Sequence, residues 1–163
     1  MKKLLVILLS LLLCVSMFGC GSEEPAPEPE QDTPAASEQE VVVSDDLTEV
    51  PEFTAEQKTS EMVDQIGFTA KDYAANLTDD DADKIIAAIK DADHKFYNGP
   101  EEMEKYMWYG YLLDYKYDDS DARSTLGTDL VQAIKYVYRG AENVTDDATI
   151  ENLRQIDKDL DNI

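Results

Sequence analysis

Apolar residues recur every three or four positions along the chain from about Thr54 to the C-terminus. This period places them on one face of an α-helix, and no segment competes with the alternation typical of a β-strand. Thr54 followed by Gln57, and Thr78 followed by Asp81, have the spacing of a capping box at a helix start. The pattern predicts an all-α domain, a bundle of five or six helices.

Breaks in this pattern divide the domain into its helices. Glycine or proline closes or opens several of the segments, as is usual at helix ends. The predicted helices run from Thr54 to Gly67, from Thr69 over a short stretch, from Thr78 through Phe96, from Pro100 to Tyr117, from beyond Asp121 to Arg139, and from about Asp147 onward.

The predicted helix from Pro100 to Tyr117 differs from the others because apolar residues surround most of its circumference. Six of the twelve residues from position 106 onward are aromatic: Tyr106, Trp108, Tyr109, Tyr111, Tyr115 and Tyr117. A helix that is apolar nearly all round is normally buried. We therefore expect this aromatic-rich helix to be the central helix of the bundle.

Two glycines, Gly110 and Gly127, fall inside this helix and the next one. At a rise of about 1.5 Å per residue, both lie about 10 Å from the turn between the two helices. An antiparallel pairing would bring them to the same level. A glycine inside a helix costs about 1 kcal/mol relative to alanine. We predict that these two glycines let the helices approach closely.

The first twenty residues follow a different pattern. Lys2 and Lys3 precede an apolar run from Leu4 to Leu13 that only Ser10 interrupts. A positive start, a short apolar core and small residues after it are the order of a secretory signal peptide. A transmembrane helix needs about 20 apolar residues, and this run is shorter. The length therefore favours a signal peptide, and a retained transmembrane span is the alternative. Residues 1–19 are predicted to be a removable leader.

The end of this leader, Val15-Ser16-Met17-Phe18-Gly19-Cys20, resembles the lipobox of bacterial lipoproteins, in which a small residue precedes an invariant cysteine. Met17 stands where that family usually has leucine. The resemblance implies cleavage before Cys20 and a diacylglyceryl thioether on its sulfur. Two or three acyl chains anchor a protein stably, whereas one is marginal. The implied location is the extracytoplasmic face of the cell membrane, with the lipid on Cys20 as the anchor.

Residues 20–52 are rich in proline and in acidic side chains. Eleven acidic residues and no basic one lie between positions 21 and 52. Such a segment cannot bury enough apolar surface to offset the ordering entropy, so we expect it to be disordered. Proline and like-charge repulsion should extend it. The predicted organisation is a signal peptide (1–19), a lipidated cysteine with a tether (20–52) and a helical domain (53–163).

Charge and cysteine content narrow the classes of partner. The 163 residues include 36 acidic and 14 basic side chains, a formal net charge of −22. This charge repels nucleic-acid phosphates, so DNA and RNA are not expected partners. Cys14 and Cys20 are the only cysteines, and both precede the helical domain. The domain is therefore expected to fold without disulfides.

Motifs for catalysis are missing from the sequence. It contains no Gly-rich phosphate loop, no GxSxG and no HExxH. His94, the single histidine, lies among Asp91, Asp93 and Lys95 on the polar side of the predicted third helix. This setting favours a solvated surface histidine over a general base. We predict no catalytic residue and no cofactor.

Acidic clusters near residues 79–83, 118–121 and 157–161 have the oxygen ligands that calcium prefers. None of them has the full pattern of an EF-hand loop. Acids in the first turn of a helix are explained by the helix dipole. We predict no metal site, with loose surface binding of calcium as the alternative.

The aromatic cluster is the leading candidate for a binding surface. Tyr and Trp rings can line a groove for a sugar, a peptide or a cation. The alternative is a packed core whose hydroxyl groups reach solvent. The candidate ligand-binding residues are Trp108, Tyr111, Tyr115, Asp118, Asp119 and Arg123.

The run from Trp108 to Glu142, which begins WYGYLLDYKY, resembles uncharacterised helical lipoproteins of Gram-positive bacteria, a group with no activity to transfer. The expected function is that of a membrane-anchored extracytoplasmic lipoprotein without evident catalysis, whose helical domain binds an envelope protein or a small ligand. Alternatives from other classes are a carboxylate-dependent hydrolase acting on cell-wall material and a structural assembly subunit.

Overall fold

The computed structural model describes residues 41–54 and 60–163 and confirms the all-α prediction for this part of the chain. Its helices are, in chain order, α2 (Ser60–Tyr73), α3 (Asp79–Ala92), α4 (Pro100–Lys116), α5 (Ala122–Tyr138) and α6 (Asp147–Leu160). Short 3₁₀ turns, η1 (Ala74–Asn76) and η2 (Lys95–Tyr97), follow α2 and α3. The predicted leader and most of the predicted tether lie outside the described residues. Within the described ranges, no helix has the length and apolar character needed to cross a membrane.

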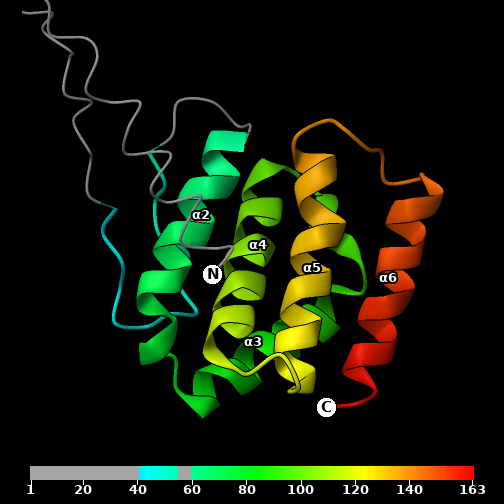
Figure 1. Ribbon diagram of the computed structural model, residues 1–163. Coiled ribbons are helices and arrows are strands. Elements are labelled where there is room, and N and C mark those ends of the chain that lie inside the picture. The colour runs from blue at the N-terminus through cyan, green and yellow to red at the C-terminus, as the bar shows by residue number, and fades with distance from the viewer. Residues whose placement is uncertain (1–40, 55–59) are drawn as a thin grey trace, which may run out of the picture. The chain divides into compact units, whose positions relative to one another are not determined.

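Four helices lie side by side in the order α2, α4, α5 and α6, and α3 lies behind this row (Figure 1). The helix α4 packs between α2 and α5, and its contact with α5 is the most extensive in the bundle. This position confirms the prediction of a central aromatic-rich helix. The buried residues of α4 are Tyr106, Met107, Trp108, Tyr109, Gly110, Leu112 and Leu113.

Several helix ends lie where the sequence predicts them, and their hydrogen bonds explain why. Thr78 Oγ1 accepts a hydrogen bond from Asp81 N at 3.1 Å and donates one to Asp81 Oδ2 at 2.6 Å, which starts α3. Pro100 is the first residue of α4, where its missing N–H is not needed. Gly140, with φ 71°, follows the end of α5 in the left-handed conformation that glycine tolerates.

The prediction of two helices separated at Gly67 is wrong. The helix α2 runs without a break from Ser60 to Tyr73, so both Gly67 and Thr69 lie inside it. A β-carbon at Gly67 would lie 3.2 Å from the ring of Tyr111, so this glycine makes room for an aromatic ring of α4. The glycine is a packing position and not a helix terminator.

The third helix also ends earlier than predicted, at Ala92 and not beyond Phe96. Asp93 and His94 both adopt the left-handed conformation, with φ 46° and 63°, and the chain then turns through η2. Phe96 is nevertheless fully buried, because η2 returns it to the core. The apolar stripe correctly predicted that Phe96 is a core residue, but it wrongly placed Phe96 in the third helix.

The predicted close approach of Gly110 and Gly127 is confirmed. A β-carbon built on Gly127 would lie 2.5 Å from the carbonyl oxygen of Gly110 and 2.7 Å from the amide nitrogen of Asp114. A β-carbon on Gly110 would lie 2.9 Å from the carbonyl oxygen of Gly127. Such distances are too short for real side chains, so the α4–α5 contact depends on both glycines.

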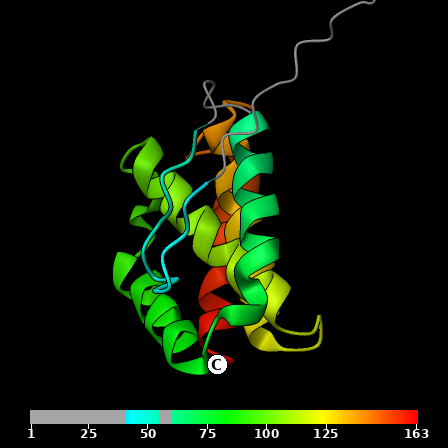
Figure 2. The ribbon, with the colours of Figure 1, turned by 90° about the vertical axis from the view of Figure 1, so that its left-hand side faces the viewer.

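Residues 41–54, here called the N-terminal strap, form neither helix nor strand, reverse direction at a turn in which Glu49 N donates to Asp46 O, and pack against the bundle (Figure 2). Leu47 is buried in the core, and its carbonyl oxygen accepts a hydrogen bond from Trp108 Nε1 at 3.0 Å. The carbonyl oxygen of Thr48 accepts one from the hydroxyl of Tyr109 at 2.7 Å. The boundary expected between residues 52 and 53 therefore falls inside a segment that belongs to the folded domain.

Candidate functional site

Trp108, the centre of the predicted aromatic binding surface, does not reach that surface. Its side chain is fully buried, and its indole nitrogen donates to Leu47 of the strap. The ring of Phe53, also in the strap, meets the Trp108 ring edge-on with centroids 6.0 Å apart. The expectation that Trp108 lines a ligand groove is wrong, because the chain's own strap covers this side of α4.

Tyr111 and Tyr115 form the part of the predicted aromatic surface that solvent reaches. Their rings stack with centroids 5.8 Å apart and planes 8° apart, and Tyr115 is 43% exposed. Burial against α2 raises the pKa of Tyr111 to about 12. The Tyr111 ring packs against Tyr115 on one side and against Gly67 of α2 on the other, so the two rings form a packed surface and not a groove.

Arg123 is engaged at the base of the bundle. It forms an ion pair with Asp121 at 2.7 Å, and its guanidinium carbon lies 3.6 Å from the centre of the Tyr117 ring. The hydrogen bonds from Arg123 lower the pKa of Asp121 to about 2. Asp79 at the start of α3 completes this cluster, accepting from the Tyr117 hydroxyl at 3.0 Å and lying 3.8 Å from Arg123.

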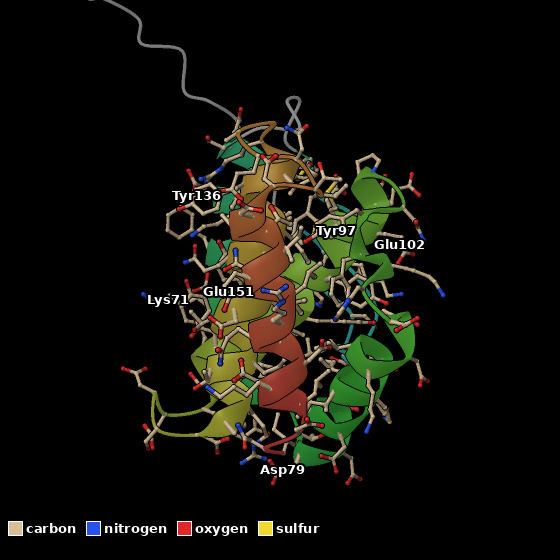
Figure 3. All side chains as sticks on the ribbon, turned by 90° about the vertical axis from the view of Figure 1, so that its right-hand side faces the viewer. Lys71, Asp79, Tyr97, Glu102, Tyr136 and Glu151 are labelled. Carbon is tan, nitrogen blue, oxygen red and sulfur yellow. The ribbon has the colours of Figure 1, made fainter. Side chains whose placement is uncertain are left out.

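The remaining predicted residues, Asp118 and Asp119, are exposed in the turn between α4 and α5. Among the described residues, no hydrogen bond, ion pair or ring contact links them or Arg123 to the Tyr111–Tyr115 pair. Figure 3 shows Asp79, which belongs to the Arg123 cluster, at one end of the bundle. Because Trp108 is buried and the other predicted residues form separate contacts, the six do not line one groove.

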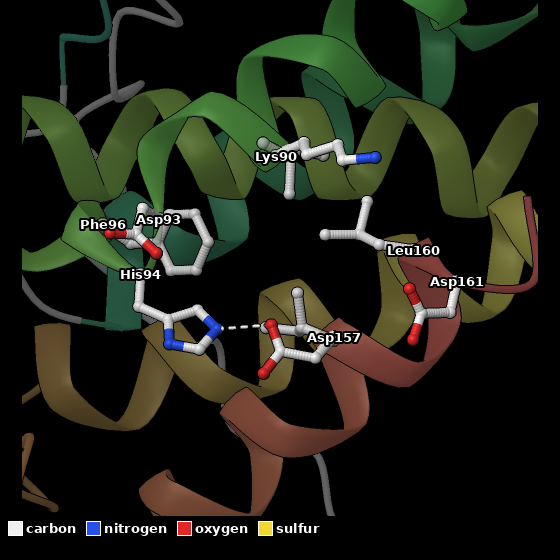
Figure 4. A pocket seen from close by; sticks show the side chains of 9 residues that line it. Lys90, Asp93, His94, Phe96, Asp157, Leu160 and Asp161 are labelled. Atoms are coloured by element: carbon white, nitrogen blue, oxygen red, sulfur yellow. Dashed lines mark hydrogen bonds and ion pairs between the residues drawn. The ribbon is translucent and has the colours of Figure 1, made fainter.

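A cavity of about 240 Å³ lies elsewhere, between the end of α3 with η2 and the C-terminal half of α6 (Figure 4). Its lining combines apolar side chains with a polar rim. The lining residues are Ile89, Lys90, Asp93, His94, Phe96, Ile156, Asp157, Leu160 and Asp161. Ile89, Phe96 and Ile156 are fully buried and belong to the core. The cavity thus opens from the surface onto the core of the domain.

The polar rim is organised by a contact between two distant parts of the chain. His94 Nε2 lies 2.7 Å from Asp157 Oδ1, a hydrogen bond that becomes an ion pair when the imidazole is protonated. Asp93 and Asp161 add two further carboxylates, and Lys90 contributes one positive charge. Because carboxylates outnumber cations, the rim has a net negative charge and an excess of hydrogen-bond acceptors.

The backbone after α3 directs His94 toward α6. Asp93 and His94 occupy the left-handed region in succession, which turns the chain sharply before η2. Asp and His are among the residues that adopt this conformation more readily, although each such position still costs about 1 kcal/mol or more. The expected position of this surface histidine on the third helix is wrong. His94 lies beyond that helix, and its side chain is 37% exposed and paired with α6.

A second acidic contact joins α5 to α6 beside the cavity. Asp159 of α6 is only 4% exposed, and its Oδ1 accepts a hydrogen bond from Gln155 Nε2 at 2.9 Å. Its other oxygen, Oδ2, is buried and has no hydrogen-bond partner. Burial, followed by the hydrogen bond to Asp159 and the charge of that group, raises the pKa of Asp129 to about 6.

Sequence reasoning missed both of these α6 contacts. His94 and Asp157 are 63 positions apart, and no local pattern pairs them. Asp159 lies within an acidic run that suggests a solvated helix end, so nothing in the sequence separates it from Asp157 or Asp161. The sequence does contain one signal. Ile156 and Leu160 mark the apolar face of α6, and Asp159, three residues after Ile156, lies close to that face.

Among residues 41–54 and 60–163, no group of three or more His, Cys, Asp or Glu side chains is arranged to hold a metal ion. Comparison of the chain with family models, with curated proteins and with solved structures finds no match.

Proposed function

We propose that the chain is a lipid-anchored envelope protein whose helical domain binds a small amine in the cavity between α3 and α6. The proposed location rests on the leader and on Cys20 with the small Gly19 before it. The proposed binding activity rests on one observation, the cavity with an apolar floor and an acidic rim.

The lining of the cavity has the composition of a ligand site. Such sites are mostly apolar, with a few polar groups that fix the orientation of the ligand. Here Phe96 and Ile156 form the floor, and Asp93 and Asp161 stand at the rim with the His94–Asp157 pair. The volume of about 240 Å³ is below the roughly 300–1,000 Å³ typical of drug-sized ligands, so a smaller molecule fits.

The charge of the rim favours a ligand with an ammonium group. Three carboxylates face a single lysine, so an anion would be repelled and an amine attracted. An amine also brings hydrogen-bond donors to a rim that has mainly acceptors. A short apolar portion of the ligand would cover Phe96 and Ile156.

Binding is favoured over catalysis by the residue types at the rim. A histidine paired with an aspartate can act as a base, but the lining has no hydroxyl or thiol nucleophile for it to activate. The Asp129–Asp159 pair does not line the cavity, and Asp159 is buried between helices. The hydrolase alternative therefore gains no support from the paired carboxylates.

The test is a titration of the isotopically labelled full-length protein with ethanolamine, glucosamine and lysine, and with acetate and phosphate as anions. Amines should shift the NMR resonances of His94 and of the Phe96 ring at millimolar concentration or below, and anions should not. The proposal is wrong if no resonance of the cavity lining responds to any amine.

A matched pair of variants locates the site. Leu160→Trp fills the cavity from α6, whereas Ile150→Trp adds the same side chain to α6 at an exposed position outside the cavity lining. The first variant should lose at least tenfold in amine affinity, which corresponds to about 1.4 kcal/mol. The second should bind as the unmodified protein does. Equal binding by both would exclude this cavity as the site.

A further inference from the structure

Two of the contacts between α6 and the rest of the domain contain titratable groups. On one side, Asp157 meets His94, which follows α3, at 2.7 Å. On the other side, Asp159 meets Asp129 of α5. Asp157 and Asp159 are two residues apart, so the two contacts fix neighbouring positions of the same helix.

The buried acid pair requires a proton to be a favourable contact. Two ionised carboxylates in contact repel each other, and Asp159 Oδ2 would then be a buried acceptor without a donor. A single shared proton converts the same pair into a charge-assisted hydrogen bond. The His94–Asp157 hydrogen bond of 2.7 Å holds the adjacent turn of α6 against the end of α3.

We propose that a proton shared by Asp129 and Asp159 docks α6 onto the bundle, next to the His94–Asp157 contact, and that loss of this proton loosens α6. We call this pair of contacts the α6 latch. Since Asp157, Leu160 and Asp161 line the cavity, the latch sets whether one cavity wall is held in place. This last step rests on the proposed function, whereas the docking of α6 does not.

The charged groups around the latch partly oppose and partly support it. Lys158 stabilises the ionised form of Asp129 and therefore opposes the shared proton. The charge of Asp159 raises the pKa of Asp129 and therefore supports the shared proton.

The sign and size of the effect follow from the Asp129 carboxyl. Its pKa is raised from 3.8 to about 6 in the docked state, so docking is strongest below about pH 4 and weakens as the pH rises to 6. A full shift of about two units corresponds to roughly a hundredfold change in the docking equilibrium. Because Asp129 is partly exposed, solvent screening reduces the effect, and we expect a change of about tenfold.

The test is hydrogen exchange of the full-length protein in detergent at pH 4.5 and 7.5, with each rate corrected for the intrinsic pH dependence of amide exchange. Protection of the α6 amides should fall about tenfold at the higher pH. Protection of the α4 amides should change less. Equal corrected protection of α6 at the two pH values would overturn the proposal.

Variants assign the effect to the acid pair. Asp129→Asn carries a permanent donor of nearly the same shape, so α6 should stay protected at both pH values. Asp159→Asn places the amide donor on the α6 member of the pair, so this variant should also keep α6 protected at both pH values. Asp119→Asn removes one exposed carboxylate from the α4–α5 turn and should keep the pH dependence. If both amide variants keep the full pH dependence, the shared proton is not the cause.

The outcome is separable from that of the proposed function because the exchange measurement contains no ligand. If the protein binds no amine but shows pH-dependent protection of α6, the proposed latch stands and the proposed binding function is wrong. If it binds an amine but protects α6 equally at both pH values, the binding function stands and the latch is wrong.

Discussion

At the scale of single residues, the molecule shows how similar residue types serve different purposes. Gly67 and Gly127 both lie inside helices, yet the first faces an aromatic ring and the second faces backbone atoms. A ring can shift by a few tenths of an ångström, whereas the backbone of a packed helix resists displacement. The consequence of adding a methyl group therefore depends on what the glycine faces.

We predict that Gly127→Ala destabilises the domain by about 2 kcal/mol. Overpacking costs about 1–3 kcal/mol, and a new β-carbon 2.5 Å from the Gly110 oxygen belongs at or above the upper end of that range. The better helix propensity of alanine returns up to about 1 kcal/mol. Urea unfolding followed by circular dichroism measures the free energy of unfolding.

Gly67→Ala is the matched control, because it brings the same gain in helix propensity. Its β-carbon would meet the Tyr111 ring at 3.2 Å, a longer contact than that of Gly127 and one with a side chain in place of backbone. The loss of stability should be clearly smaller than for Gly127→Ala. If the two variants lose equal stability, the close backbone contact between α4 and α5 does not determine the cost.

At the scale of elements, local signals predicted the helices well and the connections poorly. The start of α3 at Thr78 and that of α4 at Pro100 are properties of a few neighbouring residues, and the sequence contains them in full. The early end of α3 depends on left-handed conformations at Asp93 and His94, which side chains allow but do not impose. The continuity of α2 through Gly67 depends on a ring from another helix.

The candidate site was harder to predict than the fold for the same physical reason. Its rim depends on His94 meeting Asp157, a contact between elements that only tertiary packing brings together. The predicted aromatic surface failed because residues expected in a disordered tether cover Trp108. The proline and acid content of residues 20–52 predicted disorder for the whole segment, although one leucine in it, Leu47, is buried and docks the strap.

The strap provides a prediction at this scale. We expect Leu47→Ala to destabilise the domain by about 2–4 kcal/mol, because it removes a buried side chain and leaves a cavity beside the core. The Leu47 carbonyl oxygen, which accepts from Trp108, stays in place only if the strap stays docked. Thermal unfolding monitored by Trp108 fluorescence reports both effects, since undocking exposes the indole to water.

Val42→Ala is the control for this variant, because Val42 is 83% exposed in the same strap. Its effect on the free energy of unfolding should be within about 0.5 kcal/mol. A Leu47→Ala protein with the stability and the emission spectrum of the unmodified protein would show that the strap adds nothing to the domain.

At the scale of the whole molecule, charge is the dominant property. A net charge of −22 on 163 residues keeps the domain away from other polyanions and weakens its own compact state by repulsion. Local contacts reduce this repulsion. Arg123 forms ion pairs with Asp79 and Asp121, and the proton that we propose between Asp129 and Asp159 neutralises one negative charge. An anionic surface of this kind is also repelled by acidic lipid headgroups, so the membrane location that we propose requires the lipid on Cys20.

The lipid anchor that we propose at Cys20 can be tested by substitution. In a bacterial host that acylates lipoproteins, Cys20→Ala should abolish incorporation of labelled palmitate into the protein and should release the helical domain from the membrane fraction. The reason is that the proposed acyl chains on Cys20 would supply the apolar contact with the bilayer, about 0.8 kcal/mol for each buried methylene group.

Cys14→Ala is the control, since Leu13 before it is too bulky for the small site preceding the cut, and this variant should stay labelled and membrane-bound. Two results would contradict the anchor. Palmitate on the Cys20→Ala protein would place the lipid elsewhere, and membrane retention without label would mean that the apolar run from Leu4 to Leu13 stays in the bilayer uncleaved. The molecular mass of the mature chain distinguishes these cases, because cleavage before Cys20 removes the first nineteen residues and acylation then adds the mass of the lipid.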